Sequence, residues 1–265
     1  MFEYGDVVRL AVAGREARVT VVHERAEAAL AALQAAELRT AAGDAPAGRT
    51  WPVHPDLKAL LPGGVLRGGT LLAVQGSTSL LLALLAGASR AGAWVAFVGA
   101  PALGMLAAAD AGVELERTVL VPRPGPDAPV VVAALLDGMD AVVVGPQTAL
   151  LDADRRRLAA RARERGTLLV SQTAWRGAHL TLDARGGTWA GADHGAGWLR
   201  RRTLNVLRTG RGAAARPVEI EVEVPVGTGQ VVPEAELGHR LPVPETVELP
   251  MTEPVENDRH LRVVA

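Results

Sequence analysis

Arginines are concentrated in one quarter of the chain, where their number suits the binding of an anion. Between Ala153 and Arg216 there are fourteen arginines and only four acidic residues, and tryptophans are interspersed among them. Guanidinium groups neutralise phosphates and indole rings stack on bases, so this composition is typical of a surface for single-stranded DNA. The residues that we predict to bind DNA or a protein partner are Arg155, Arg156, Arg157, Trp175, Arg176, Arg200, Arg201, Arg202, Arg208 and Arg211.

Two other interpretations of this arginine-rich region stay open. Six of its arginines lie on one predicted helix over residues 152–165. At about 100° per residue they cannot all face the same side, so part of their charge would be a solvated helix surface. A protein partner is the third possible occupant. The sequence therefore leaves DNA binding, protein docking and plain solvation as alternatives.

In a parallel α/β domain, the place to look for a phosphate site is the turn after the first core strand. In this chain that turn is Gly76-Ser77-Thr78-Ser79. A working phosphate loop has the pattern GxxxxGK[ST], in which the lysine contacts the phosphates and the hydroxyl contacts magnesium. This turn has one glycine and no lysine, and Lys58, the only lysine of the chain, lies upstream of the strand. Its serines and threonine suit a helix cap. We therefore interpret the turn as a degenerate phosphate loop and predict no cofactor.

The acidic residue that helps to hold magnesium in such enzymes is also absent from the expected strand ends. The strand over 140–144 runs into Gly145-Pro146, and the strand over 94–98 runs into Gly99-Ala100-Pro101. The chain has no cysteine, and its six histidines show no metal-binding spacing. The sequence thus predicts a non-enzymatic protein with no catalytic residue and no metal site.

Short apolar runs alternate with Ala- and Leu-rich helical runs from Gly68 onward, a pattern typical of a doubly wound α/β domain with a mostly parallel sheet. Three later β-like runs predict an antiparallel C-terminal extension, with Gly186-Gly187 and 210–212 as its turns. The predicted strands are 70–74, 94–98, 118–121, 141–144, 167–171, 178–182, 202–207 and 218–224, and the predicted helices are 79–91, 103–111, 129–137 and 152–165.

Three stretches carry a resemblance to a known family. Residues 61–70, LPGGVLRGGT, precede the first core strand and look like the entry to a RecA-like core. Residues 135–144 are similar to a Walker B strand, and 168–172 to the next RecA strand, which ends in a nucleotide-sensing glutamine. Within that superfamily the chain resembles the ImuA-type proteins, accessory factors of the bacterial translesion mutasome, and in particular their actinobacterial form. The resemblance covers about residues 51–226.

This resemblance implies a role in damage-induced mutagenesis, as a RecA-like adaptor with a degenerate P-loop. The implied partners are an ImuB-like inactive polymerase subunit and an error-prone, replicative-type polymerase. One alternative is an SOS-type regulator that binds a division or replication protein without DNA. A second alternative is an unorthodox ATPase, in which Ser77, Thr78, Ser79 and an arginine replace the usual loop.

The composition separates three regions. Residues 1–50 are predicted to be an N-terminal arm or hairpin, a helix over 24–40 and a linker over 41–49; residues 51–227 form the core. Residues 228–265 hold five prolines and seven acidic residues, which favours a flexible tail or a partner-binding peptide. A net charge of −1 argues against a wholly basic nucleic-acid binder. With no signal segment or long apolar run, we expect a cytoplasmic protein without membrane contact, with self-association left open.

Overall fold

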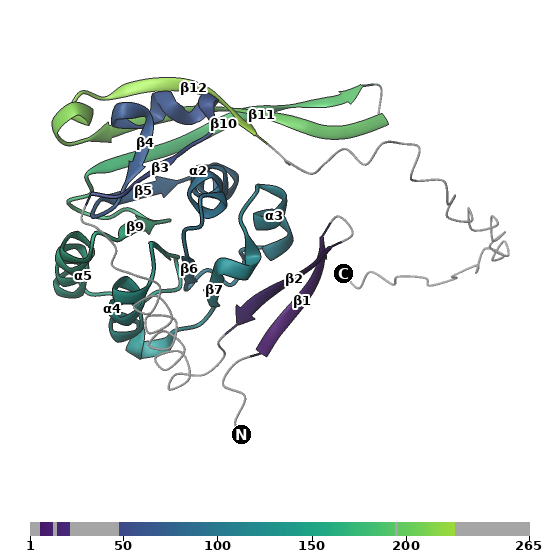
Figure 1. Cartoon of the computed structure of the whole chain (residues 1–265). Helices are drawn as coiled ribbons and strands as arrows, with labels where there is room; N and C mark the ends of the chain where they lie inside the picture. Colours follow the sequence, from purple (N-terminus) through teal and green to yellow (C-terminus); the bar gives the residue numbers. More distant parts are fainter. Residues whose placement is uncertain (1–5, 13–14, 22–47, 194–195, 226–265) are drawn as a thin grey trace, which may run out of the picture. The chain divides into compact units, whose positions relative to one another are not determined.

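The computed structural model describes the backbone of residues 6–12, 15–21, 48–193 and 196–225, and the side chains of residues 48–189 and 202–225. A ten-stranded sheet, in the order β1-β2-β7-β6-β8-β9-β5-β10-β11-β12, runs through this part of the chain (Figure 1). The strands are β1 (Asp6–Val12), β2 (Arg15–Val21), β5 (Leu71–Gln75), β6 (Val95–Val98), β7 (Thr118–Val121), β8 (Ala141–Val144), β9 (Leu168–Ser171), β10 (Leu180–Asp193), β11 (Ala196–Gly210) and β12 (Val218–Pro225).

The strands from β2 to β10 in this order are parallel to their neighbours. The pairs β1–β2, β10–β11 and β11–β12 are antiparallel. The prediction of a mixed α/β fold, with a mostly parallel sheet and an antiparallel C-terminal edge, is therefore confirmed. The α-helices are α2 (Thr78–Arg90), α3 (Met105–Asp110), α4 (Ala128–Gly138) and α5 (Asp152–Arg165).

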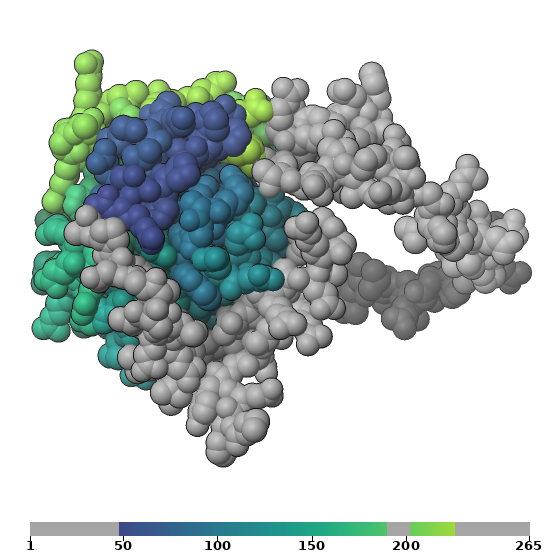
Figure 2. Space-filling model, viewed as in Figure 1, coloured from purple at the N-terminus to yellow at the C-terminus, as the bar shows by residue number. Residues whose placement is uncertain are grey.

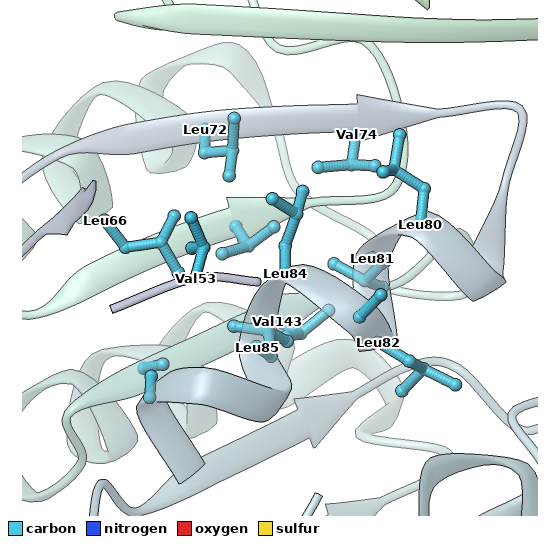
Figure 3. Packing of buried hydrophobic residues seen from close by; sticks show 14 of the residues in the cluster. Val53, Leu66, Leu72, Val74, Leu80, Leu81, Leu82, Leu84, Leu85 and Val143 are labelled. Atoms are coloured by element: carbon cyan, nitrogen blue, oxygen red, sulfur yellow. The ribbon is translucent and has the colours of Figure 1, made fainter. Parts of the chain in front are cut away.

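Successive side chains along each core strand point to opposite faces of the sheet and belong to two separate hydrophobic cores, one on either face. Leu72 and Val74 of β5 point toward the leucines of α2, as Figure 3 shows. Leu71 and Ala73, the alternate residues of the same strand, belong to the core that α4 and α5 cover. Strands that are buried on both faces explain the continuous apolar runs of the sequence.

The local sequence explains where the two longest helices begin and end. Ser77 caps α2, because its Oγ accepts a hydrogen bond from the N–H of Leu80 at 3.1 Å. Helix α5 has Asp152 and Asp154 in its first turn and arginines in its last, so both ends complement the helix dipole. Gly166 ends α5 in the left-handed conformation, at φ 67°.

The predicted turn at Gly186-Gly187 is wrong. Strand β10 continues to Asp193, and the two glycines lie at a shift in its register with β11, between Arg185 and Thr188. A Cβ at Gly187 would lie 2.4 Å from the carbonyl oxygen of Thr203, so glycine lets the two strands approach closely at this irregularity. The predicted turn at 210–212 is confirmed, since β11 ends at Gly210 and a short 3-10 helix follows, η5 (Gly212–Ala214).

Near the N-terminus, β1 and β2 form the predicted hairpin, and β2 joins the sheet beside β7. The predicted helix over 24–40, most of the linker over 41–49 and the tail over 228–265 lie outside the described residues. No helix that the structure describes is long and apolar enough to cross a membrane. The predicted domain boundaries stay predictions.

The segment before β5 forms a small substructure of its own. Strands β3 (Thr50–Pro52) and β4 (Val65–Arg67) pair in an antiparallel two-stranded sheet. Two short 3-10 helices lie between these strands, η1 (Pro55–Leu60) and η2 (Pro62–Gly64). Two others lie later in the chain: η3 (Leu115–Arg117) precedes β7, and η4 (Gly125–Asp127) precedes α4. In Figure 2 this blue segment lies against the yellow-green β12. The LPGG motif, residues 61–64, therefore lies in the segment that precedes the first core strand, β5.

Candidate functional site

One pocket lies at the carboxyl ends of the parallel strands, the edge where α/β proteins bind their ligands. We call it the edge pocket; its volume is about 290 Å³. None of the residues that line it is charged. They are Val74, Gly76, Ser77, Thr78, Ala100, Pro101, Ala102, Leu103, Pro146, Gln147 and Gln172. The edge pocket thus lies where α/β proteins usually bind ligands, and both the glutamine after β9 and the turn before α2 line it.

Backbone packing accounts for the glycine of the turn before α2. Gly76 has φ 79°, and a Cβ there would lie 2.0 Å from the carbonyl oxygen of Ala184 in β10. The neighbouring strand β10 therefore requires a glycine at this position. Arg202 donates a hydrogen bond to the Oγ of Ser79 at 3.3 Å, but it does not line the edge pocket. Lys58 lies on η1 and does not line it either.

Of the two acidic residues in the stretch 135–144, Asp140 is the one next to a strand, and it lies at the amino end of that strand. Asp140 precedes β8, whereas the edge pocket lies beyond the last residue of that strand. The carboxylate is buried; it accepts hydrogen bonds from Arg49 at 2.6 Å and from the N–H of Trp94 at 2.9 Å. These contacts tie β8 to β6 and to the segment before β3, which is a structural role.

A second depression brings together much of the predicted DNA or partner surface. It has a volume of about 380 Å³ and lies between α5, the β9–β10 connection and the β11–β12 turn. We call it the arginine groove. It is lined by Leu71, Asp152, Arg155, Arg156, Ala159, Ala160, Arg163, Trp175, Arg176, Gly177 and Arg211. Its α5 residues recur at helical spacing, so they form one stripe of the helix.

Trp175 supports one of these arginines from below. Its side chain is 5% exposed and belongs to the core under α4 and α5. The guanidinium carbon of Arg155 lies 4.9 Å from the centre of the indole ring, within range of a cation–π interaction. Arg155 also donates to the carbonyl of Ala174 at 3.1 Å. Trp175 thus positions Arg155 and has little free ring surface for a base.

The arginine groove carries a strong excess of positive charge. Asp152 is the one carboxylate among its lining residues, against five arginines. Within the described part of the chain no ion pair joins any of these arginines, whereas Arg161 and Arg165 on the same helix both pair with Asp137. Burial, and then repulsion by Arg163 and Arg211, lower the pKa of His179 beside the groove from its usual 6.5.

The other predicted residues lie elsewhere. Arg157 faces a groove between α4 and α5, on another stripe of the helix. Arg202 stacks on Trp189, with 5.0 Å between the guanidinium carbon and the ring centre. Arg208 donates to the carbonyl of Ala59 at 2.9 Å. The side chains of Arg200 and Arg201 lie outside the described residues.

Sequence reasoning did not select Arg163 for the site, although it lines the groove. The signal was present, because positions 152, 156, 159, 160 and 163 share one helical stripe with 155. Among the described residues, no cluster of three or more His, Asp or Glu side chains could hold a metal ion.

Two comparisons connect this chain with known proteins. Residues 59–177 match the family model described as the MT3502 N-terminal domain. Over 130 residues the chain is 42% identical to the uncharacterized protein Rv3395c of Mycobacterium tuberculosis (strain ATCC 25618 / H37Rv). The matched stretch covers 48% of this chain and 64% of that protein. The chain thus matches less than two thirds of that relative's length. The family match includes the α5 and Trp175 side of the arginine groove and ends before Arg211, and neither description names a RecA-like or ImuA-type protein.

Proposed function

We propose that this chain is a non-catalytic adaptor of a translesion-synthesis complex, and that it holds single-stranded DNA in the arginine groove while it binds protein partners. The observation that carries the DNA part is the convergence of five arginines on one groove with a single carboxylate. Phosphates are the ligands that such an excess of guanidinium groups favours. The remaining arginines of the predicted surface are spread over other elements.

The adaptor part of the proposal rests on the sequence motifs and on the strand order. In the order β7-β6-β8-β9-β5, the strand after the LPGG motif, β5, lies beside β9, and Gln172 directly follows β9. This order supports the RecA-like part of the proposal. The uncharged lining of the edge pocket favours a protein that has kept this architecture without its phosphate chemistry. The proposed partners are an ImuB-like inactive polymerase subunit and an error-prone polymerase.

The ATPase alternative has one contact in its favour, the hydrogen bond from Arg202 to Ser79. An arginine at the N-terminus of α2 is a possible substitute for the missing lysine. However, Arg202 does not line the edge pocket, and the stack with Trp189 holds its guanidinium against β10. The adaptor is therefore the better supported function.

Fluorescence anisotropy of a labelled single-stranded oligonucleotide tests the proposal. With five phosphate contacts the affinity should fall by about 100-fold between about 50 and 200 mM salt. Addition of ATP and magnesium should leave the affinity unchanged. Absence of binding at low salt would contradict DNA binding, and binding that requires ATP would favour the ATPase.

A further inference from the structure

A smaller pocket opens beside the arginine groove, and the LPGG motif forms one of its walls. Its volume is about 150 Å³, and Leu61, Leu66, Leu72 and Leu180 are among its lining residues. We call it the leucine pocket. Leu71 and Arg211 line both the leucine pocket and the arginine groove, so the two are adjacent.

The size of the leucine pocket fits one six-membered ring. An apolar cavity of roughly 150 Å³ in another protein takes up benzene. Most of the residues that line the pocket are apolar, which favours a flat, weakly polar group over a charged one. The guanidinium-bearing Arg67 and Arg211 also line it, and they place positive charge next to the apolar surface.

One side chain of the pocket can recognise a carbonyl oxygen. The Nδ1 atom of His179 accepts a hydrogen bond from the N–H of Leu71 at 2.9 Å, so the neutral ring carries its proton on Nε2. Burial and the two nearby arginines lower the pKa of His179, which keeps the ring neutral. A ring that donates one hydrogen bond matches the exocyclic oxygens that every pyrimidine base presents.

We propose that the leucine pocket binds one pyrimidine base of a single strand whose phosphates lie on the arginine groove. The inference rests on the proposed DNA binding and extends it to the class of nucleotide. A nucleotide joins a flat ring, which suits the leucine pocket, to a phosphate, which suits the adjacent arginine groove. A base inside a duplex must first be unpaired and unstacked, at a cost of a few kcal/mol, so the pocket would favour single strands.

A substitution that fills the leucine pocket, with a control on the same turn, tests this inference. Ala213 lines the pocket and is exposed; Ala215, two residues later, is also exposed and does not line it. The variants are Ala213→Trp and Ala215→Trp, with Ala213→Leu as a milder filling. The probes are a labelled thymidine dodecamer and an abasic deoxyribose-phosphate strand of the same length.

We expect the wild-type protein to bind the thymidine strand about tenfold more tightly than the abasic strand, which is the contribution of one bound base. Ala213→Trp should abolish this preference and keep the affinity for the abasic strand. Ala213→Leu should reduce the preference, and Ala215→Trp should leave it unchanged. Melting curves of all variants check that they are folded.

Equal wild-type affinities for the two strands would overturn the inference and leave DNA binding by the arginine groove standing. A preference that persists in Ala213→Trp would also overturn it. Binding of neither strand by the wild-type protein would contradict the proposed function itself. If the wild-type protein then bound an acidic, leucine-containing peptide and Ala213→Trp did not, the pocket would belong to a protein partner instead.

Discussion

The edge pocket and the arginine groove divide between them what a nucleotide-binding protein usually combines. The edge pocket lies at the carboxyl ends of the parallel strands, yet no charged residue lines it. The arginine groove lies along α5 and gathers five arginines. The usual ligand-binding position of the fold and the concentration of positive charge are thus separated in this chain. The fold alone would point to the first pocket, whereas the charges point to the second.

Gly76 beside the edge pocket and Trp175 beside the arginine groove both serve packing. At the edge pocket, Gly76 makes room for the backbone of β10. At the arginine groove, Trp175 is buried and holds Arg155 above its ring. The difference lies in what the packing supports. At the edge pocket it supports an uncharged turn, and at the arginine groove it supports arginines that no acid of the described residues pairs with.

The largest expected effect concerns the edge pocket. Gly76→Ala forces a Cβ against the carbonyl of Ala184, at a positive φ, and should destabilise the protein by more than about 3 kcal/mol. The melting temperature should fall by about 10 °C. Gly186→Ala is the matched control, because φ is 62° there and no atom lies within 4 Å of the added Cβ. It should cost about 1 kcal/mol. Equal losses would show that Gly76 is not held by β10.

The next effect concerns the arginine groove. Arg156→Glu combined with Arg163→Glu reverses two charges of its α5 stripe, and should weaken the binding of single-stranded DNA by about 100-fold at low salt. Anisotropy titrations measure this change. The melting temperature should fall by only a few degrees, because Arg163→Glu places an acidic residue in the last turn of α5, while neither arginine pairs with an acid among the described residues.

Neighbouring residues on α5 provide the matched control. Arg156 and Arg157 are both exposed, but Arg157 lies outside the groove. Arg156→Glu alone should weaken binding by about tenfold, and Arg157→Glu by about twofold or less. Equal effects would mean that the whole helix, and not the groove, attracts DNA.

The smallest effect is a pH dependence from His179. Because the folded-state pKa is lowered from 6.5, the unfolded chain binds more protons as the pH falls below 6.5. The stability that this neutral histidine contributes is therefore present above pH 6.5 and is lost as the pH falls to the lowered pKa. His179→Gln should show a smaller loss of melting temperature between neutral pH and about pH 5. An unchanged pH dependence would contradict the assignment.

Much of the core could be predicted from sequence because its strands are short apolar runs separated by clear helix signals. The predicted strands 118–121 and 141–144 and the predicted helix 152–165 agree with β7, β8 and α5. The error at Gly186-Gly187 has a physical cause. A glycine pair is typical of a hairpin turn, but here it lets β11 approach an irregular β10.

The candidate site was harder to predict because its residues come from three separate segments. The high arginine content of residues 153–216 indicates Arg155, Arg176 and Arg211 as candidates. Only the fold brings these three side chains to one groove. The place of Arg163 follows from its helical stripe and not from the number of charges on α5. The leucine pocket had no sequence signal beyond the LPGG motif.

Crosslinking of a 4-thiothymidine oligonucleotide, followed by mass spectrometry of the crosslinked peptides, tests the central claim most directly. Both regions compete for the same probe, so the result compares them within one experiment. We predict crosslinks within residues 152–179 and at the turn around Arg211, with none at the edge pocket. Crosslinks at residues 76–78 or 100–103, with α5 and the β9–β10 connection free, would contradict the account.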